Sequence, residues 1–314
     1  MDEPDKKKDR LIRQSCPVCL GKNFVPERKV RDHVSLSQFT VSRCKDCTVR
    51  FISDPPSPDV IQRHYQNPAG KCMHSNGSPI HQRMRELLFR SEMKPLLKRI
   101  PPDSHIIDYG AGDGGISGFF QKMGFKVSAL DMYPPSEWSL PAVEYRQMDL
   151  NKPSLLSFET SSGGAPVRAV VLRHVLEHLC EPANILATVR DADAKYVVVI
   201  VPNYKSILRP VLGEYWYYWD PPRHLTYFTE QSLYCLAERS GYKMLESTTY
   251  AVDELVTSFH RYMLLNQAYS QSELARRIVS FTDPKSALAG ISSAVASFFG
   301  NCMIHAVFEK YKHH

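Results

Sequence analysis

Two CxxC pairs separated by twenty-four residues most constrain how the N-terminal part of this chain folds. The four cysteines are Cys16, Cys19, Cys44 and Cys47. Four thiolates at this spacing are typical of a tetrahedral zinc site, in which each sulfur lies about 2.3 Å from the metal. A redox-active dithiol, two disulfides or unbound thiols are the alternatives. We expect residues 15–53 to form a zinc ribbon, with short strands at Phe39–Arg43 and Val49–Ser53 that carry the second pair.

The composition is that of a globular protein with room for one large domain and one small one. The chain has 314 residues, of which 43% are hydrophobic, enough for a core that needs no disulfides. No apolar run reaches the roughly 18 residues of a membrane span, and the first ten residues are charged where a signal peptide would be apolar. We therefore expect no membrane segment and a cytoplasmic location.

Positive charge is concentrated in the N-terminal third. Residues 1–100 contain 20 Lys and Arg against 11 Asp and Glu, whereas residues 101–314 contain 19 against 22. A basic surface of this kind attracts RNA or a phosphorylated small molecule. Solvated helix faces and a charged tail are the alternative explanation.

We expect four segments along the chain. Residues 1–14 are predicted to be a disordered tail before the ribbon. Residues 54–104 are predicted to be a linker with an amphipathic helix at 80–100, where apolar residues recur mostly every three or four positions. The second domain then spans 105–314. Within it, residues 253–300 read as a mostly helical insertion that packs on the core or covers the site.

Strands and helices alternate through the second domain, which is typical of a doubly wound, mostly parallel sheet. Helices are predicted from about residue 115 to Gly124, at 182–190 and at 229–240. The seven predicted strands are Ile106–Tyr109, Lys126–Asp131, Val143–Asp149, Val167–Leu172, Tyr196–Pro202, Lys243–Tyr250 and Asn301–Lys310. We therefore predict an α/β fold with a seven-stranded sheet.

A glycine-rich turn follows the first of these strands. Gly110 and Gly112 let the backbone turn sharply and approach a ligand closely. Asp108 puts a carboxylate at the end of the strand, which suits a cationic amino acid group better than a pyrophosphate. Asp131 and Asp149 follow at the ends of the next two strands. Ligands of open α/β sheets bind at these carboxyl ends.

This Asp-x-Gly-x-Gly-x-Gly run resembles the first motif of class I methyltransferases that depend on S-adenosylmethionine (SAM). The resemblance implies a Rossmann-like fold with SAM as cofactor. It also implies that Asp131 accepts hydrogen bonds from both ribose hydroxyls and that Asp149 lies near the adenine amino group. Arg173, at the end of the fourth strand, is counted with these candidate cofactor residues.

Two further segments are similar to one methyltransferase subgroup. His174–His178 (HVLEH) and Pro222–Leu225 (PRHL) resemble bacterial methyltransferases that carry an N-terminal zinc ribbon and modify glycans or secondary metabolites. The second segment is also similar to one in nucleotide-sugar C-methyltransferases. That likeness implies His224 as a general base and His178 as a second active-site histidine. Arg223 stands where those C-methyltransferases have a glutamate, so the acceptor atom stays open among oxygen, nitrogen and carbon.

We therefore predict an enzyme that transfers a methyl group from SAM to a small-molecule acceptor, such as a sugar, a glycan intermediate or a secondary metabolite. Histidine suits the base because its ordinary pKa is about 6.5, and zinc would be structural. An RNA methyltransferase that docks through its basic ribbon is the first alternative. A non-catalytic protein that binds SAM is the second. The acceptor, the oligomeric state and the choice between His178 and His224 stay open.

Overall fold

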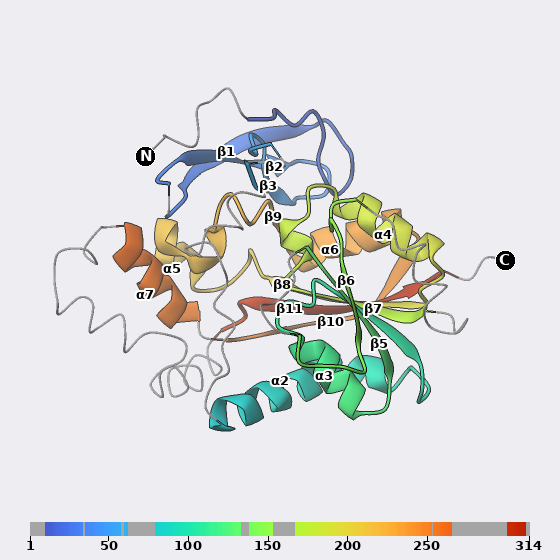
Figure 1. The fold of residues 1–314 in the computed structure, drawn as a ribbon. Coiled ribbons are helices and arrows are strands. Elements are labelled where there is room, and N and C mark those ends of the chain that lie inside the picture. Colours follow the sequence, from blue (N-terminus) through green and yellow to red (C-terminus); the bar gives the residue numbers. More distant parts are fainter. Residues whose placement is uncertain are drawn as a thin grey trace. The chain divides into compact units, whose positions relative to one another are not determined.

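The structure is a computed structural model (Figure 1). It describes residues 10–33, 35–57, 60–61, 79–132, 138–152, 167–252, 254–265 and 300–311. Most of the expected tail, residues 58–59 and 62–78 of the expected linker, and residues 253 and 266–299 of the expected insertion lie outside these ranges. Contacts divide the chain into two compact units: unit 1 is Met1–Ser75, Pro202–Thr229 and Thr249–Ile304, and unit 2 is Asn76–Val201, Glu230–Thr248 and His305–His314. The domain boundaries expected from the sequence stay predictions.

Unit 2 is built around a seven-stranded sheet, as predicted. The order across the sheet is β10-β11-β8-β7-β4-β5-β6. The strands are β4 (His105–Tyr109), β5 (Lys126–Asp131), β6 (Glu144–Gln147), β7 (Val167–Arg173), β8 (Tyr196–Pro202), β10 (Tyr242–Tyr250) and β11 (Met303–Lys310). β4 pairs in parallel with β5 and β7, β5 with β6, and β7 with β8.

The order of the strands indicates where a ligand site is expected. The chain enters at β4, steps outward through β5 and β6, and returns to pair β7 with the other side of β4. The strand order therefore reverses between β4 and β7. In open α/β sheets the loops at the carboxyl ends of such strands diverge and leave a crevice for the ligand.

The sheet forms the core of unit 2 because its central strands are apolar along their whole length. All seven residues of β8 and all five of β4 are buried, as expected of strands covered on both faces. Helices α2 and α3 cover one face, and α4 and α6 the other (Figure 1). Their bounds are α2 (Pro79–Leu97), α3 (Gly115–Lys122), α4 (Pro182–Asp191) and α6 (Glu230–Arg239), and a short 3₁₀ helix, η4, spans Leu176–His178.

Unit 1 contains a four-stranded sheet in the order β1-β2-β3-β9. The strands are β1 (Phe24–Arg31), β2 (Gln38–Cys44), β3 (Arg50–Ile52) and β9 (Thr226–Tyr227). Its helices are α5 (Arg209–Leu212), the 3₁₀ helices η5 (Gly213–Tyr215) and η6 (Tyr217–Trp219), and α7 (Glu254–Leu265). Phe39, Val41 and Phe51 are fully or almost fully buried and form the core of the sheet.

Two strands of unit 1 were not predicted. β1 reads FVPERKVR and has a single buried residue, Val30, so it lacks the hydrophobic alternation that marks a half-buried strand. β9 has only two residues, yet it pairs antiparallel with β3, with Arg50 opposite Tyr227 and Phe51 opposite Thr226. The amide of Ile52 also donates to the carbonyl oxygen of Leu225 at 2.9 Å. The segment that carries His224 is thereby joined to the cysteine-bearing sheet.

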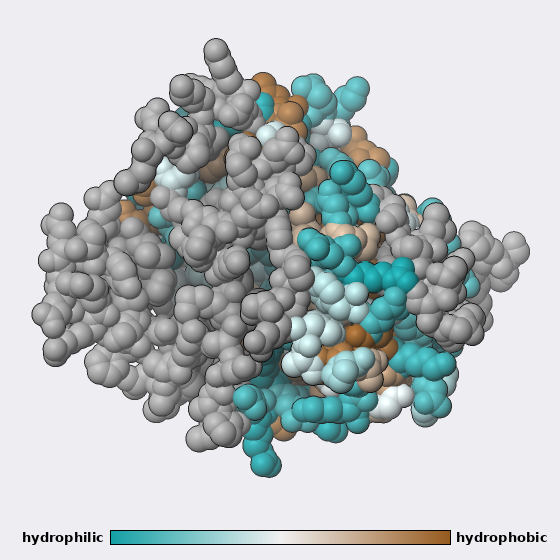
Figure 2. Space-filling model, viewed as in Figure 1, coloured by the Kyte–Doolittle hydropathy of each residue, from teal (hydrophilic) through white to brown (hydrophobic). Residues whose placement is uncertain are grey.

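Within the described residues, no helix combines the length and the hydrophobicity that a membrane crossing requires. On the face drawn in Figure 2, hydrophilic residues cover much of the described surface, and hydrophobic residues lie among them in smaller groups. Scattered apolar residues of this kind are normal on protein surfaces.

Candidate active site

The glycine turn after β4 has the conformation that its sequence predicts. Gly110, Gly112 and Gly114 have φ of 83°, 56° and 78°, a left-handed region that costs other residues about 1–2 kcal/mol. A Cβ atom at Gly110 would lie 2.3 Å from a methyl carbon of Val175. Glycine at this position therefore lets the loop after β4 pack against the loop after β7, at the switch point of the sheet.

Asp108 lies beneath this turn and is buried. The hydroxyl of Ser117 donates to its Oδ2 at 2.6 Å. Burial raises the pKa of the Asp108 carboxyl to about 6, although the hydrogen bonds from Ser117 act in the opposite direction. A cation placed near a buried carboxyl stabilises its charged form.

Asp131 ties the glycine turn to the end of β5. The amide of Gly112 donates to its Oδ2 at 2.8 Å. The amides of Gly110 and Ala111 donate to the carbonyl oxygen of Leu130 at 2.8 and 2.9 Å. These bonds hold a carboxylate and a ligand-approaching turn in one fixed arrangement at the carboxyl end of the sheet.

An ion pair supports the same loop from α2. The Nη1 and Nη2 atoms of Arg85 donate to the two carboxylate oxygens of Asp113 at 2.6 and 2.5 Å. The amide of Gly115 donates to Asp113 at 3.1 Å. Sequence reasoning missed Arg85, because an arginine on an amphipathic helix carries no signal of the loop it reaches.

Asp149 and Arg173 have partners that the sequence did not indicate. Asp149 lies two residues beyond β6, which is shorter than predicted, and its Oδ1 accepts the amide of Asn151 at 3.0 Å. Arg173 ends β7 and pairs with the buried Glu92 of α2, with 2.9 Å between Nε and Oε2. Their assignments as cofactor residues stay predictions.

His178 ends the short helix η4, which follows β7. Its amide donates to the carbonyl oxygen of Val175, the residue that packs on Gly110, at 2.9 Å. His174 precedes η4 with φ of 55°, and its Nδ1 lies 3.5 Å from a carboxylate oxygen of Glu177. Through Val175, the HVLEH segment thus packs against the glycine turn at the switch point.

His224 belongs to unit 1 and is buried there. Its Nδ1 lies 2.8 Å from the carbonyl oxygen of Tyr218, so this nitrogen carries the proton of a neutral ring and donates it. The Tyr218 ring lies parallel to the imidazole, 6.5 Å between centroids. This arrangement fixes the tautomer and leaves Nε2 as the basic nitrogen.

Asp220 is the centre of a buried charge network around His224. Its Oδ2 lies 2.6 Å from Nη2 of Arg223 and 4.0 Å from Nε2 of His224. Its Oδ1 lies 3.7 Å from Nδ1 of His33, which in turn lies 3.3 Å from Nη1 of Arg261. Burial would raise the pKa of Asp220, but the charge of Arg223, followed by the effects of the two histidines and Arg261, lowers it to about 2. The carboxylate is therefore charged at neutral pH beside a candidate base.

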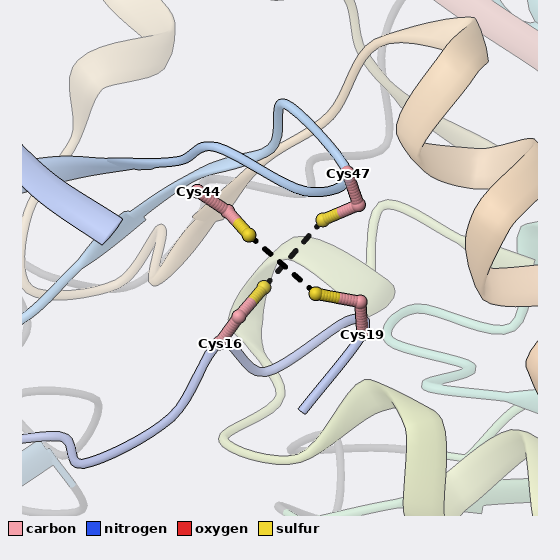
Figure 3. Close-up of side chains that lie close together, drawn as sticks. All are labelled: Cys16, Cys19, Cys44 and Cys47. Atoms are coloured by element: carbon pink, nitrogen blue, oxygen red, sulfur yellow. Dashed lines mark hydrogen bonds between the residues drawn. The ribbon is translucent and has the colours of Figure 1, made fainter. Parts of the chain in front are cut away.

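The four cysteines of unit 1 converge on one point (Figure 3). The sulfurs of Cys16 and Cys47 are 3.6 Å apart, and those of Cys19 and Cys44 are 3.5 Å apart. A tetrahedron with metal–sulfur bonds of 2.3 Å has edges of about 3.8 Å, whereas a disulfide needs about 2.05 Å. The donor set and its spacing fit a tetrahedral thiolate metal site and exclude disulfides in this arrangement.

The two CxxC turns share one backbone geometry. In each, the amide of the first cysteine donates to the carbonyl oxygen five residues further on, at 2.9 Å. The residues after the second cysteines, Leu20 and Thr48, both have left-handed φ, 61° and 63°. Two equivalent turns therefore present their sulfurs from opposite sides of the site.

A comparison with known protein families agrees with these features of unit 2, which are the glycine turn, the acidic strand ends and the order of the sheet. A family model described as "Methyltransferase domain" matches residues 80–247, just over half of the chain. This chain is a member of that family. The methyltransferase is thus an enzyme that depends on SAM, and the seven-stranded sheet of unit 2 is its catalytic fold. The match begins after the four cysteines, so it does not bear on the metal site.

Solved structures similar to the methyltransferase come from several organisms. A SAM-dependent methyltransferase from Archaeoglobus fulgidus is 15% identical, with 72% of this chain and 94% of that chain covered and a TM-score of 0.47. The 1,6-didemethyltoxoflavin-N1-methyltransferase of Burkholderia thailandensis is 13% identical, with 85% and 98% covered and a TM-score of 0.46. These proteins are too distant to indicate the acceptor of this enzyme. No curated protein matches the chain in sequence.

Proposed function

We propose that this methyltransferase transfers a methyl group from SAM to a small-molecule acceptor, with His224 as the general base and a structural zinc ion bound by the four cysteines. The observation that best supports a SAM site is the hydrogen bond from the Gly112 amide to Asp131. It fixes a carboxylate beside a turn that only glycine permits. The charged Asp220 beside His224 supports the assignment of His224 as the general base.

In the proposed SAM site, each acidic residue has a separate role. Asp131 accepts hydrogen bonds from the ribose hydroxyls, and Asp108 stabilises the positive amino group of the methionine part. Asp149 lies near the adenine, and the glycine turn admits the ligand without steric hindrance. SAM supplies an already activated methyl group, so these residues need only to bind and orient it for in-line attack.

Replacing Asp131 by alanine tests the SAM site. We expect SAM and S-adenosylhomocysteine to bind the variant at least about tenfold more weakly, because a hydrogen bond to a charged group contributes about 1.5–3 kcal/mol. Isothermal titration calorimetry measures this. Asp191→Ala removes an exposed carboxylate at the end of α4 and serves as the matched control. Equal SAM affinity in Asp131→Ala and Asp191→Ala would contradict the assignment.

The raised pKa of Asp108 predicts that SAM affinity depends on pH. Below about pH 6 the buried carboxyl takes up a proton and loses the charge that favours the SAM amino group. If the charged form is required, SAM should bind roughly tenfold more weakly at pH 5 than at pH 7. Asp108→Asn should bind weakly and with no such dependence. Wild-type affinity that stays constant between pH 7 and pH 5 would contradict the role of Asp108.

The proposed base acts on a proton of the acceptor. His224 keeps Nε2 available because Nδ1 donates to Tyr218. When Nε2 takes up a proton, the negative charge of Asp220 stabilises the imidazolium that forms. His178 is the second candidate for this role, and it lies in the catalytic fold of unit 2.

Zinc would act through the fold rather than in the reaction. A four-cysteine site has no open coordination position for a substrate. The sheet that the cysteines bring together pairs through β3 with β9, two residues after His224. Zinc thereby supports the backbone that carries the proposed base.

A further inference from the structure

Four arginines gather on the sheet of unit 1 and next to it. They are Arg28 of β1, Arg43 of β2, Arg50 of β3 and Arg209 of α5. The guanidinium carbons of Arg50 and Arg209 lie 4.6 and 4.1 Å from the centre of the Tyr204 ring, and that of Arg28 lies 4.9 Å from the Trp219 ring. The two rings are themselves 5.9 Å apart. The aromatic pair therefore holds these guanidinium groups close together.

The carboxylate of Glu27 forms ion pairs with this arginine cluster. Glu27 accepts Arg50 Nε at 3.0 Å and the Tyr204 hydroxyl at 2.9 Å, and lies 3.7 Å from Arg43 Nε. Glu27 is the extra residue of a β-bulge, since Pro26 pairs with Ser42 and Arg28 with Val41. Bulges re-aim side chains and occur next to functional sites.

Arg28 and Arg209 form no ion pair with any residue that the structure describes. Arg43 and Arg50 are directly opposite each other in the pairing of β2 with β3, where like charges are destabilising. Burial lowers the pKa of the Arg209 guanidinium, and the charges of Arg28 and Arg50 lower it further. The cluster thus holds an excess of positive charge that one carboxylate does not neutralise.

We propose that the arginine cluster binds a phosphate or diphosphate group of the small-molecule acceptor. Guanidinium groups stacked on rings keep their N–H edges for hydrogen bonds, and their planar fork matches phosphate oxygens. Three of the four charges converge on one aromatic pair, which suits a single phosphate group rather than the extended track of a nucleic-acid strand. That this group belongs to the methyl acceptor rests on the proposed function.

The position of the cluster within unit 1 supports an acceptor as its ligand. Trp219, on which Arg28 stacks, directly precedes Asp220. The Tyr227 hydroxyl of β9 donates to the carbonyl oxygen of Trp219 at 2.8 Å, and the Tyr227 and Trp219 rings are 5.1 Å apart. One continuous set of contacts therefore runs from the arginine cluster to the segment that carries His224.

Titration of the full-length, zinc-loaded protein with inorganic pyrophosphate, in low salt and without SAM, tests the proposal. We expect saturable binding, about tenfold weaker in Arg28→Gln. Because Arg28 is exposed and stacks on only one ring, its loss should leave the fold intact. Lys29→Gln removes an exposed charge from the next position of β1 and should change binding by less than about twofold. SAM binding and zinc content of the same samples report on the fold.

Three results would overturn the proposal. They are no pyrophosphate binding by the wild type at about 10 mM, equal losses in Arg28→Gln and Lys29→Gln, and binding of a single-stranded RNA of about 20 nucleotides without binding of pyrophosphate. Inorganic phosphate in a parallel titration distinguishes a site for one phosphate from a site for two. Any of the three, with normal SAM binding by the wild type, would refute the phosphate site alone, whereas a wild type that binds no SAM would refute the proposed function.

Discussion

Replacing Cys44 by serine is expected to remove zinc from the protein, to unfold the sheet of unit 1 and to abolish methyl transfer to the acceptor. The four sulfurs lie within 4.8 Å of one another, so the loss of one leaves an incomplete tetrahedral site. Binding of structural zinc contributes an apparent 10–16 kcal/mol to the folding of small zinc domains, about as much as the stability of a whole domain. The sheet it supports has only four strands, one of them two residues long.

Zinc content by mass spectrometry and amide hydrogen exchange of residues 38–52 and 226–227 measure this outcome. We expect about one zinc per chain in the wild type and none in the variant, with faster exchange in β2, β3 and β9. Cys235→Ser, which changes a cysteine of α6 outside the cluster, is the matched control. The proposed SAM residues all belong to unit 2, so SAM should still bind. Full zinc content in Cys44→Ser, or loss of SAM binding with the zinc, would contradict the account.

Replacing His224 by glutamine is expected to lower kcat about 10²–10⁴-fold, the usual contribution of a general base. The glutamine side chain cannot take up a proton at this position. The affinity for SAM should not change, because His224 belongs to unit 1 and the proposed SAM residues to unit 2. Initial rates with labelled SAM and calorimetry of SAM binding separate the two effects.

His178→Gln is the comparison for this prediction, and we expect it to lower kcat less than His224→Gln does. If kcat fell strongly in His178→Gln while kcat of His224→Gln stayed within about tenfold of the wild type, His178 would be the base. Asp220→Asn adds a second test of His224. It removes the negative charge 4.0 Å from Nε2, so kcat should fall while SAM affinity is retained.

The sequence predicted those parts of the fold that depend on local patterns. β5 and β8 have the predicted bounds, and Gly110 and Gly112 have the left-handed backbone that their motif requires. The cysteine spacing predicted that four sulfurs would meet, and they do. Such features are encoded within a few residues or by a repeated spacing, so they can be found without knowing which segments pack together.

Features that depend on pairing between distant segments could not be predicted. The network at Asp220 includes His33 after β1 and Arg261 of α7, and neither residue lies in a recognisable motif. The Arg173–Glu92 pair joins β7 to a helix about eighty residues earlier. β9 is too short for a periodic signal, and only its pairing with β3 identifies it. Each depends on tertiary contacts that local propensity does not contain.

The most direct test of a small-molecule acceptor is incubation of the enzyme with methyl-labelled SAM and a fractionated extract of its source organism. We expect label in the low-molecular-mass fraction, at least about tenfold less of it with Asp131→Ala at limiting SAM, and a labelled product retained on an anion-exchange column because it carries phosphate. Label that enters RNA or protein instead, or label that enters small molecules equally with the wild type and Asp131→Ala, would contradict the account.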